Sequence, residues 1–91
     1  MTLDELYKII EERKKEKPQG SYVASLFDEG PARITQKVGE EAVEVVIAAN
    51  QEKKDRVVSE MADLWFHCLV LLSALDIKPE EVYAELEKRR K

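Results

Sequence analysis

The sequence predicts an all-α protein, a small helical bundle that forms one domain over residues 1–91. Aromatic residues, which favour strands, make up only 7% of the chain, whereas helix-forming Glu, Lys, Leu and Ala are abundant. The chain is 44% hydrophobic and 37% charged, which is typical of a globular protein. Its prolines and glycines separate apolar segments, except for Gly39. This glycine falls inside an expected helix at a cost of roughly 1 kcal/mol, which indicates close approach of substrate or backbone, or packing clearance.

We expect five helices, and three of them begin with a recognisable signal. Thr2 and Glu5 form a capping box, in which each side chain accepts a hydrogen bond from an otherwise unpaired backbone N–H. Ser21 is a typical N-cap for a short second helix that Gly30 ends, and Pro31 suits the first position of the third helix. The expected ranges are, in order, 2–15, 21–27, 31–49, 53–75 and from 79 onward.

The charge balance excludes several classes of partner. The formal net charge is −4, so no basic stripe is available to follow a nucleic-acid backbone, and an anionic substrate needs a cation beside it. The longest apolar run, 68–72, is too short to span a membrane, and the N-terminus is acidic where a signal peptide is basic. The single cysteine, Cys68, cannot form an intrachain disulfide and is expected to be a buried small hydrophobe. We therefore expect a cytoplasmic protein without nucleic-acid or membrane partners.

Two of the helices are apolar on more sides than a single small chain can cover. In the 31–49 helix, Val43 and Ile47 fall outside both the main apolar side and the polar side. The 53–75 helix is apolar almost all round, and one polar stripe interrupts it. The stripe consists of Arg56, Glu60, Asp63 and His67. Because a helix of this kind must be buried on several sides, we expect a homodimer whose shared bundle completes the core.

These two helices each carry a pair of carboxylates one turn apart. Glu41 and Glu44 form the first pair, and Glu60 and Asp63 form the second. Packed helices lie about 8–10 Å apart, so four acids on neighbouring antiparallel helices can converge on one point. Mg²⁺ or Mn²⁺, which prefer oxygen ligands, would relieve their mutual repulsion. The alternative is that each acid is a solvated surface charge, which is the commonest role of a glutamate on a helix.

Each basic or polar residue near these acids has two interpretations. Arg33 and Lys37, one turn apart, either hold phosphate oxygens or pair within the helix, as Lys37 would with Glu41. Arg56 is a third candidate for phosphate binding. His67 lies one turn beyond an acid of the polar stripe. His67 either forms a hydrogen bond with the expected metal ligand Asp63, or it is a polar core residue that hydrogen-bonds another neighbour.

The carboxylate pattern and its flanks resemble a known family. Glu-Glu-x-x-Glu followed by Glu-x-x-Asp resembles the signature of the all-α nucleoside triphosphate pyrophosphohydrolases. The runs at 21–26, 37–49 and 60–72 are similar to the phosphoribosyl-ATP pyrophosphohydrolase family, which acts at the second step of histidine biosynthesis. The Lys-Val-Gly-Glu-Glu run and the Phe-His pair are the more specific flanks, and the resemblance covers nearly the whole chain.

The resemblance implies a reaction and a set of site residues. Water would attack the α-phosphorus of phosphoribosyl-ATP and release pyrophosphate and phosphoribosyl-AMP. The implied Mg²⁺ ligands are Glu41, Glu44, Glu60 and Asp63. Glu40 would bind a second ion or orient the attacking water, so Glu40 and Glu41 are the expected catalytic acids. Two rivals stay open: a related enzyme that removes noncanonical or surplus nucleoside triphosphates, and a helical dimerisation module without catalysis.

Overall fold

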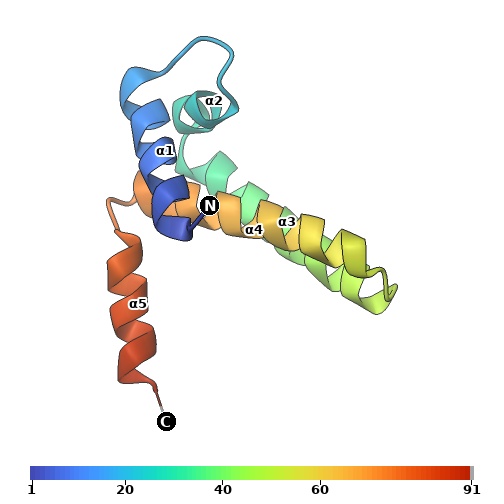
Figure 1. The fold of residues 1–91 in the computed structure, drawn as a ribbon. Helices are drawn as coiled ribbons and strands as arrows, with labels where there is room; N and C mark the ends of the chain where they lie inside the picture. The colour runs from blue at the N-terminus through green and yellow to red at the C-terminus, as the bar shows by residue number, and fades with distance from the viewer. Residues whose placement is uncertain (91) are drawn as a thin grey trace.

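The computed structural model describes residues 1–90, which form five α-helices and no strand (Figure 1). The helices are α1 (Leu3–Glu16), α2 (Tyr22–Glu29), α3 (Pro31–Asn50), α4 (Lys54–Ala74) and α5 (Pro79–Lys88). The predicted all-α fold is therefore confirmed. The helix ends lie within two residues of the positions that the capping and breaking residues predict.

Local signals in the sequence set the helix ends. Thr2 and Glu5 form the predicted capping box, with both hydrogen bonds at 3.1 Å. Ser21 caps α2 by accepting a hydrogen bond from the backbone N–H of Ala24 at 3.1 Å. Gly30 has φ of +96°, a conformation that glycine adopts without steric cost. One residue can therefore end α2 and begin α3.

The buried core lies at one end of the molecule, where α1, α2, the start of α3 and the end of α4 meet. Its members are Ile10, Val23, Leu26, Ile34, Leu69 and Val70. Leu26, Ile34 and Val70 are fully buried, and each such side chain contributes about 1.5–3 kcal/mol through its removal from water. This core holds the two N-terminal helices against the α3–α4 pair.

Beyond the core, α3 and α4 run side by side in opposite directions as a hairpin (Figure 1). We call residues 39–65 of this hairpin the arm. Its apolar side chains are mostly exposed, including Val46 (59%), Val58 (64%) and Trp65 (52%). The radius of gyration is 14.2 Å, compared with about 12 Å for a compact domain of this length. The chain is thus elongated, and the several-sided apolar character predicted for these helices is left uncovered within residues 1–90.

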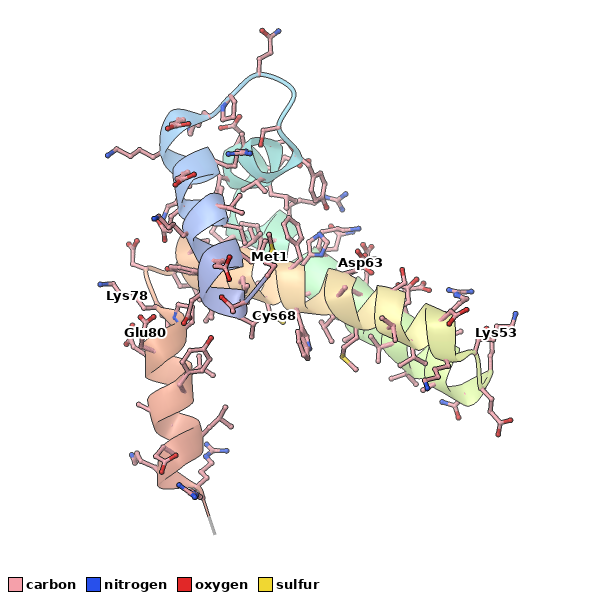
Figure 2. All side chains as sticks on the ribbon, viewed as in Figure 1. Met1, Lys53, Asp63, Cys68, Lys78 and Glu80 are labelled. Carbon is pink, nitrogen blue, oxygen red and sulfur yellow. The ribbon has the colours of Figure 1, made fainter. Side chains whose placement is uncertain are left out.

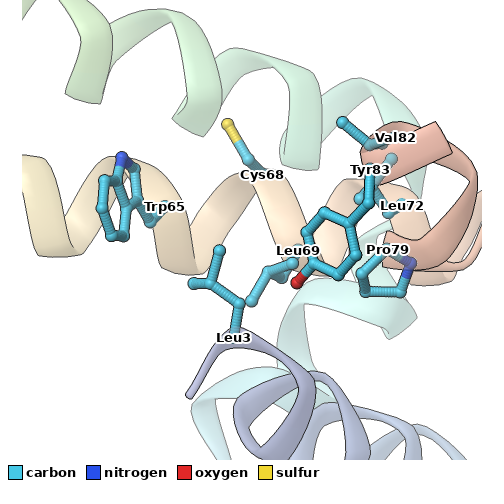
Figure 3. Close-up of a pocket in the computed structure, with 8 residues that line it drawn as sticks. All are labelled: Leu3, Trp65, Cys68, Leu69, Leu72, Pro79, Val82 and Tyr83. Atoms are coloured by element: carbon cyan, nitrogen blue, oxygen red, sulfur yellow. The ribbon is translucent and has the colours of Figure 1, made fainter. Parts of the chain in front are cut away.

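The last helix, α5, extends away from the rest of the bundle, with side chains along its length open to solvent (Figures 1 and 2). An apolar cavity of about 170 Å³ lies at its base, between Leu3 of α1, Trp65 and Cys68 of α4 and Val82 of α5 (Figure 3). Cys68 is half-buried at the cavity wall, so it is less buried than the small core hydrophobe that the sequence predicts. Partial burial raises the pKa of its thiol.

The helix α4 is long and apolar enough, by length and composition alone, to cross a membrane. Only 22% of its most apolar window is buried within the chain. The sequence predicts no spanning segment because its uninterrupted apolar runs are short, whereas apolar residues are spread along the whole length of α4. Core helices of soluble proteins have the same length and composition. The finding therefore identifies a helix that needs apolar cover, without saying what supplies it.

Candidate metal site on α3 and α4

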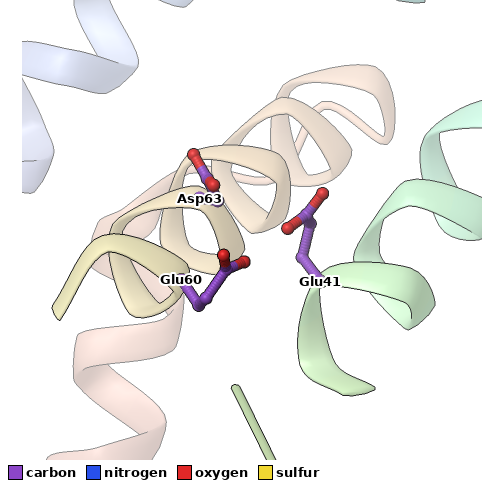
Figure 4. A group of neighbouring side chains, drawn as sticks. All are labelled: Glu41, Glu60 and Asp63. Carbon is purple, nitrogen blue, oxygen red and sulfur yellow. The ribbon is translucent and has the colours of Figure 1, made fainter. Parts of the chain in front are cut away.

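Three carboxylates converge between the two helices of the arm. Glu41 reaches from α3 toward Glu60 and Asp63 on α4, and one oxygen from each lies within 4.8 Å of the others (Figure 4). The side chains of Glu41 and Glu60 are only 13% and 17% exposed. Water therefore screens their repulsion less than it would on an open surface. Three oxygen donors at this spacing suit a hard divalent cation such as Mg²⁺ or Mn²⁺.

The fourth predicted ligand, Glu44, lies outside this group of three. Its carboxylate is 3.8 Å from the guanidinium of Arg56, which also contacts Glu60 at 3.5 Å. All four acids lie on facing sides of α3 and α4, as their spacing predicts, and Arg56 bridges Glu44 and Glu60. Arg56 is therefore part of the site, as an ion-pair partner of two acids.

Lys37 pairs with the acids on its own helix. Its ammonium is 3.3 Å from Glu41 and 3.6 Å from Glu40. Partial burial acts to lower the pKa of Lys37, but the hydrogen bond to Glu41 and the electrostatic effects of Tyr22, Glu41 and Glu40 outweigh it, so the pKa is raised. The i,i+4 pairing interpretation of Lys37 is therefore realised, and the ammonium lies directly beside the carboxylate group.

Two other predicted residues lie further out. Glu40 is exposed at the edge of the group, where its carboxylate accepts a hydrogen bond from the Gln36 amide at 3.1 Å. Arg33 is 3.9 Å from Glu29, and within residues 1–90 it makes no ion pair with the converging acids. Sequence spacing grouped Arg33 with Lys37 because both lie on one side of α3, but the bend between α2 and α3 gives Arg33 a nearer partner.

His67 is buried behind the acids and is 5% exposed. Its Nδ1 lies 2.7 Å from the backbone carbonyl oxygen of Asp63, and its Nε2 lies 2.9 Å from the Tyr22 hydroxyl. His67 thus contacts the backbone of Asp63 rather than its carboxylate, and it is a polar core residue with both nitrogens paired. The contact between Tyr22 and His67 could not be predicted from the sequence, because no helical spacing relates a residue on α2 to one on α4.

The fold and the site define a class of protein: a helical protein in which carboxylates from two antiparallel helices converge at a spacing that could hold a divalent cation. Comparison with known proteins identifies the family. The family model for phosphoribosyl-ATP pyrophosphohydrolase matches residues 3–90, and the chain belongs to this family. The predicted family is confirmed, and with it the expectation of a hydrolase acting on a phosphoanhydride bond rather than of a non-catalytic module.

The similar proteins match over nearly the whole chain. A phosphoribosyl-ATP pyrophosphatase from Saccharolobus solfataricus is 48% identical over 89 residues, which cover 98% of this chain and 95% of the relative. A protein of the same name from Geobacter metallireducens is 52% identical over 87 residues, which cover 96% of this chain and 80% of the relative. One from Saccharolobus islandicus is 46% identical over 89 residues, with coverage of 98% and 95%.

Proposed function

We propose that this chain hydrolyses phosphoribosyl-ATP to phosphoribosyl-AMP and pyrophosphate, with Mg²⁺ as the cofactor and Mn²⁺ as a possible substitute. The observation that carries the proposal is the convergence of Glu41, Glu60 and Asp63 within 4.8 Å in a member of this family. A polyphosphate is strongly anionic and the chain has a net charge of −4. A bound cation is therefore needed for the substrate and the acids to meet.

The acids are proposed to hold the ion as a set. Glu41, Glu60 and Asp63 supply the oxygens that already face one another, and Glu44 joins them when Arg56 turns from it toward substrate. The cation supplies charge neutralisation of the polyphosphate and a lowered pKa for a bound water. The low solvent exposure of the Glu41 and Glu60 side chains fits this role, because two carboxylates so close together are stabilised by a cation between them.

The remaining site residues are assigned to the phosphates and the proton. Lys37 and Arg56 lie beside the acids and carry charge that suits phosphate oxygens, and Arg33 is an outer phosphate contact. Glu40 is exposed next to the cation ligands, so it is the proposed acceptor of the proton from the attacking water, with Glu41 orienting that water. Positioning and charge neutralisation are the main tasks in such a reaction.

We also propose that the active form is a homodimer in the cytoplasm. The accessible surface is 6547 Å², whereas a folded monomer of this mass exposes about 5,400 Å². The excess of about 1,100 Å² is more than the roughly 800 Å² that each partner loses in a standard interface. Arg56, Glu60 and Asp63 along α4 favour protein over lipid as the cover, because charges are costly within a membrane.

The dimer is tested by sedimentation of the purified protein. We expect twice the chain mass of 10.5 kDa for the wild type and the single-chain mass for Val58→Glu, which places a charge on the most exposed valine of the arm. Val58→Thr is the matched control, because it keeps the side-chain shape. A monomeric wild type at micromolar concentration would contradict the proposal.

The reaction is tested by following pyrophosphate release from phosphoribosyl-ATP with Mg²⁺, with Mn²⁺ and with a chelator. We expect metal-dependent release that Glu41→Gln abolishes, while Glu12→Gln, an exposed glutamate on α1, keeps full activity. Faster turnover of common nucleoside triphosphates would instead assign the chain to the related enzymes that remove surplus nucleotides. Release that is indifferent to the chelator would contradict the metal site.

A further inference from the structure

A hydroxyl group from a third helix is connected to the backbone of Asp63, one of the converging acids, through His67. Tyr22 lies in the first turn of α2 and is 48% exposed. Its hydroxyl oxygen is 2.9 Å from Nε2 of His67, and its ring stacks on Phe66 with centroids 6.1 Å apart and planes at 23°. The ring of His67 meets Phe66 edge-on at 5.0 Å. These contacts fix the position of the Tyr22 hydroxyl even though half of the side chain faces solvent.

The direction of the hydrogen bonds follows from the chemistry of the partners. The carbonyl oxygen of Asp63 can only accept, so Nδ1 of His67 donates to it across 2.7 Å. A neutral imidazole carries one N–H, so Nε2 has a lone pair and accepts a hydrogen bond from the Tyr22 hydroxyl. The hydroxyl proton of Tyr22 is thus committed to His67. Its oxygen presents lone pairs, and no proton, to whatever lies outside.

The Tyr22 hydroxyl also lies close enough to Lys37 to affect its electrostatics. Lys37 contacts Glu41 at 3.3 Å, and His67 contacts the backbone of Asp63. Tyr22 is therefore linked by hydrogen bonds through His67 to the backbone of Asp63. A hydrogen-bond acceptor at this place suits a ligand group that donates. Ionised phosphate oxygens only accept, whereas sugar hydroxyls and amino groups donate.

We propose that Tyr22 binds the nucleoside part of the substrate, its hydroxyl oxygen accepting a hydrogen bond from a sugar hydroxyl or amino group. This inference rests on the proposed function and extends it. The phosphates remain with Lys37, Arg56 and the cation at the acids, and α2 supplies the contact that distinguishes a nucleotide from a bare polyphosphate.

The test compares the two products as inhibitors of the wild type and of Tyr22→Phe, which keeps the ring and removes the hydroxyl. We expect the KM for phosphoribosyl-ATP and the inhibition constant of phosphoribosyl-AMP to rise about 10-fold, the usual effect of one lost hydrogen bond. The inhibition constant of pyrophosphate and kcat should stay within twofold. Tyr83→Phe is the matched control, because its hydroxyl bonds Asp4 on the far side of the chain and should change none of these constants.

Two results would overturn the assignment. An unchanged inhibition constant for phosphoribosyl-AMP would show that the hydroxyl makes no contact with the nucleoside part. Equal weakening of phosphoribosyl-AMP and pyrophosphate would show that Tyr22 acts through the acids instead. Calorimetric binding of phosphoribosyl-AMP to both proteins makes the same comparison without turnover, so a failure of the reaction itself is seen separately, in the wild type.

Discussion

The two halves of α4 lie in different surroundings. From His67 to Ala74 the helix is covered by α1, α2 and the start of α3, and it contributes Leu69 and Val70 to the core. From Lys54 to Asp63 it packs mainly against α3, and it carries two of the converging acids and exposed apolar side chains such as Val58. One helix therefore stabilises the chain at one end and carries the chemistry at the other. Substitutions in one half of α4 can therefore change the stability of the chain without changing the proposed metal site, and the reverse.

The largest effect is expected from a substitution that disrupts the proposed metal site in the arm and leaves the core intact. Glu60→Gln should lower kcat/KM about 10³-fold, because a lost metal ligand removes several kcal/mol of charge stabilisation from the transition state. Glu44→Gln should cost only about 10-fold if Glu44 is the outermost ligand, since its carboxylate pairs with Arg56 and lies outside the group of three acids. Steady-state pyrophosphate release measures both. Equal losses would mean that Glu44 binds the ion as closely as Glu60.

The next largest effect is expected from a substitution that disrupts the core and leaves the arm intact. Leu26→Ala removes a fully buried side chain and should reduce the free energy of unfolding by about 2–5 kcal/mol, as judged by urea denaturation. Val46→Ala replaces a side chain on the arm that is 59% exposed. It should change the free energy of unfolding of the monomer by less than about 0.5 kcal/mol. A large loss for Val46→Ala that disappears on dilution to the monomer would assign the arm's stability to the dimer.

A third measurement connects the two regions through the cation. Mg²⁺ at 100 times its dissociation constant should stabilise the folded wild type by about 2.7 kcal/mol, because it binds only when the acids are brought together. The melting temperature of Glu60→Gln should respond far less to Mg²⁺. An equal response in both proteins would show that the ion binds elsewhere.

The smallest expected effect concerns Gly39, at the base of the arm. No atom in residues 1–90 lies within 4 Å of the Cβ that an alanine would add there. Gly39→Ala should therefore stabilise α3 by about 1 kcal/mol in thermal unfolding of the monomer. A simultaneous loss of activity or of dimerisation would show that substrate or the partner chain approaches this backbone, which is one of the two explanations that the sequence offers.

The sequence by itself determined the elements and the family. The capping box at Thr2, the N-cap at Ser21 and the prolines act through neighbours in the chain, so the helix ends could be predicted within two residues. Helical periodicity likewise placed Glu41, Glu60 and Asp63 on facing sides of two helices, because positions on a helix surface follow from 3.6 residues per turn. The signature of the acids indicated the all-α nucleoside triphosphate pyrophosphohydrolases, and the flanking Lys-Val-Gly-Glu-Glu run and Phe-His pair indicated the family.

Only the tertiary structure decided which side chains meet. Arg56 bridges Glu44 and Glu60, and Tyr22 bonds His67 across 45 positions of sequence. Neither contact follows from periodicity, because each depends on how helices pack and on which of several charged partners lies nearest. The half-burial of Cys68 has the same origin, since α5 leaves a cavity at its base instead of closing over α4. Helix identity is a local property of the chain, whereas contacts between helices depend on the packing of the whole fold.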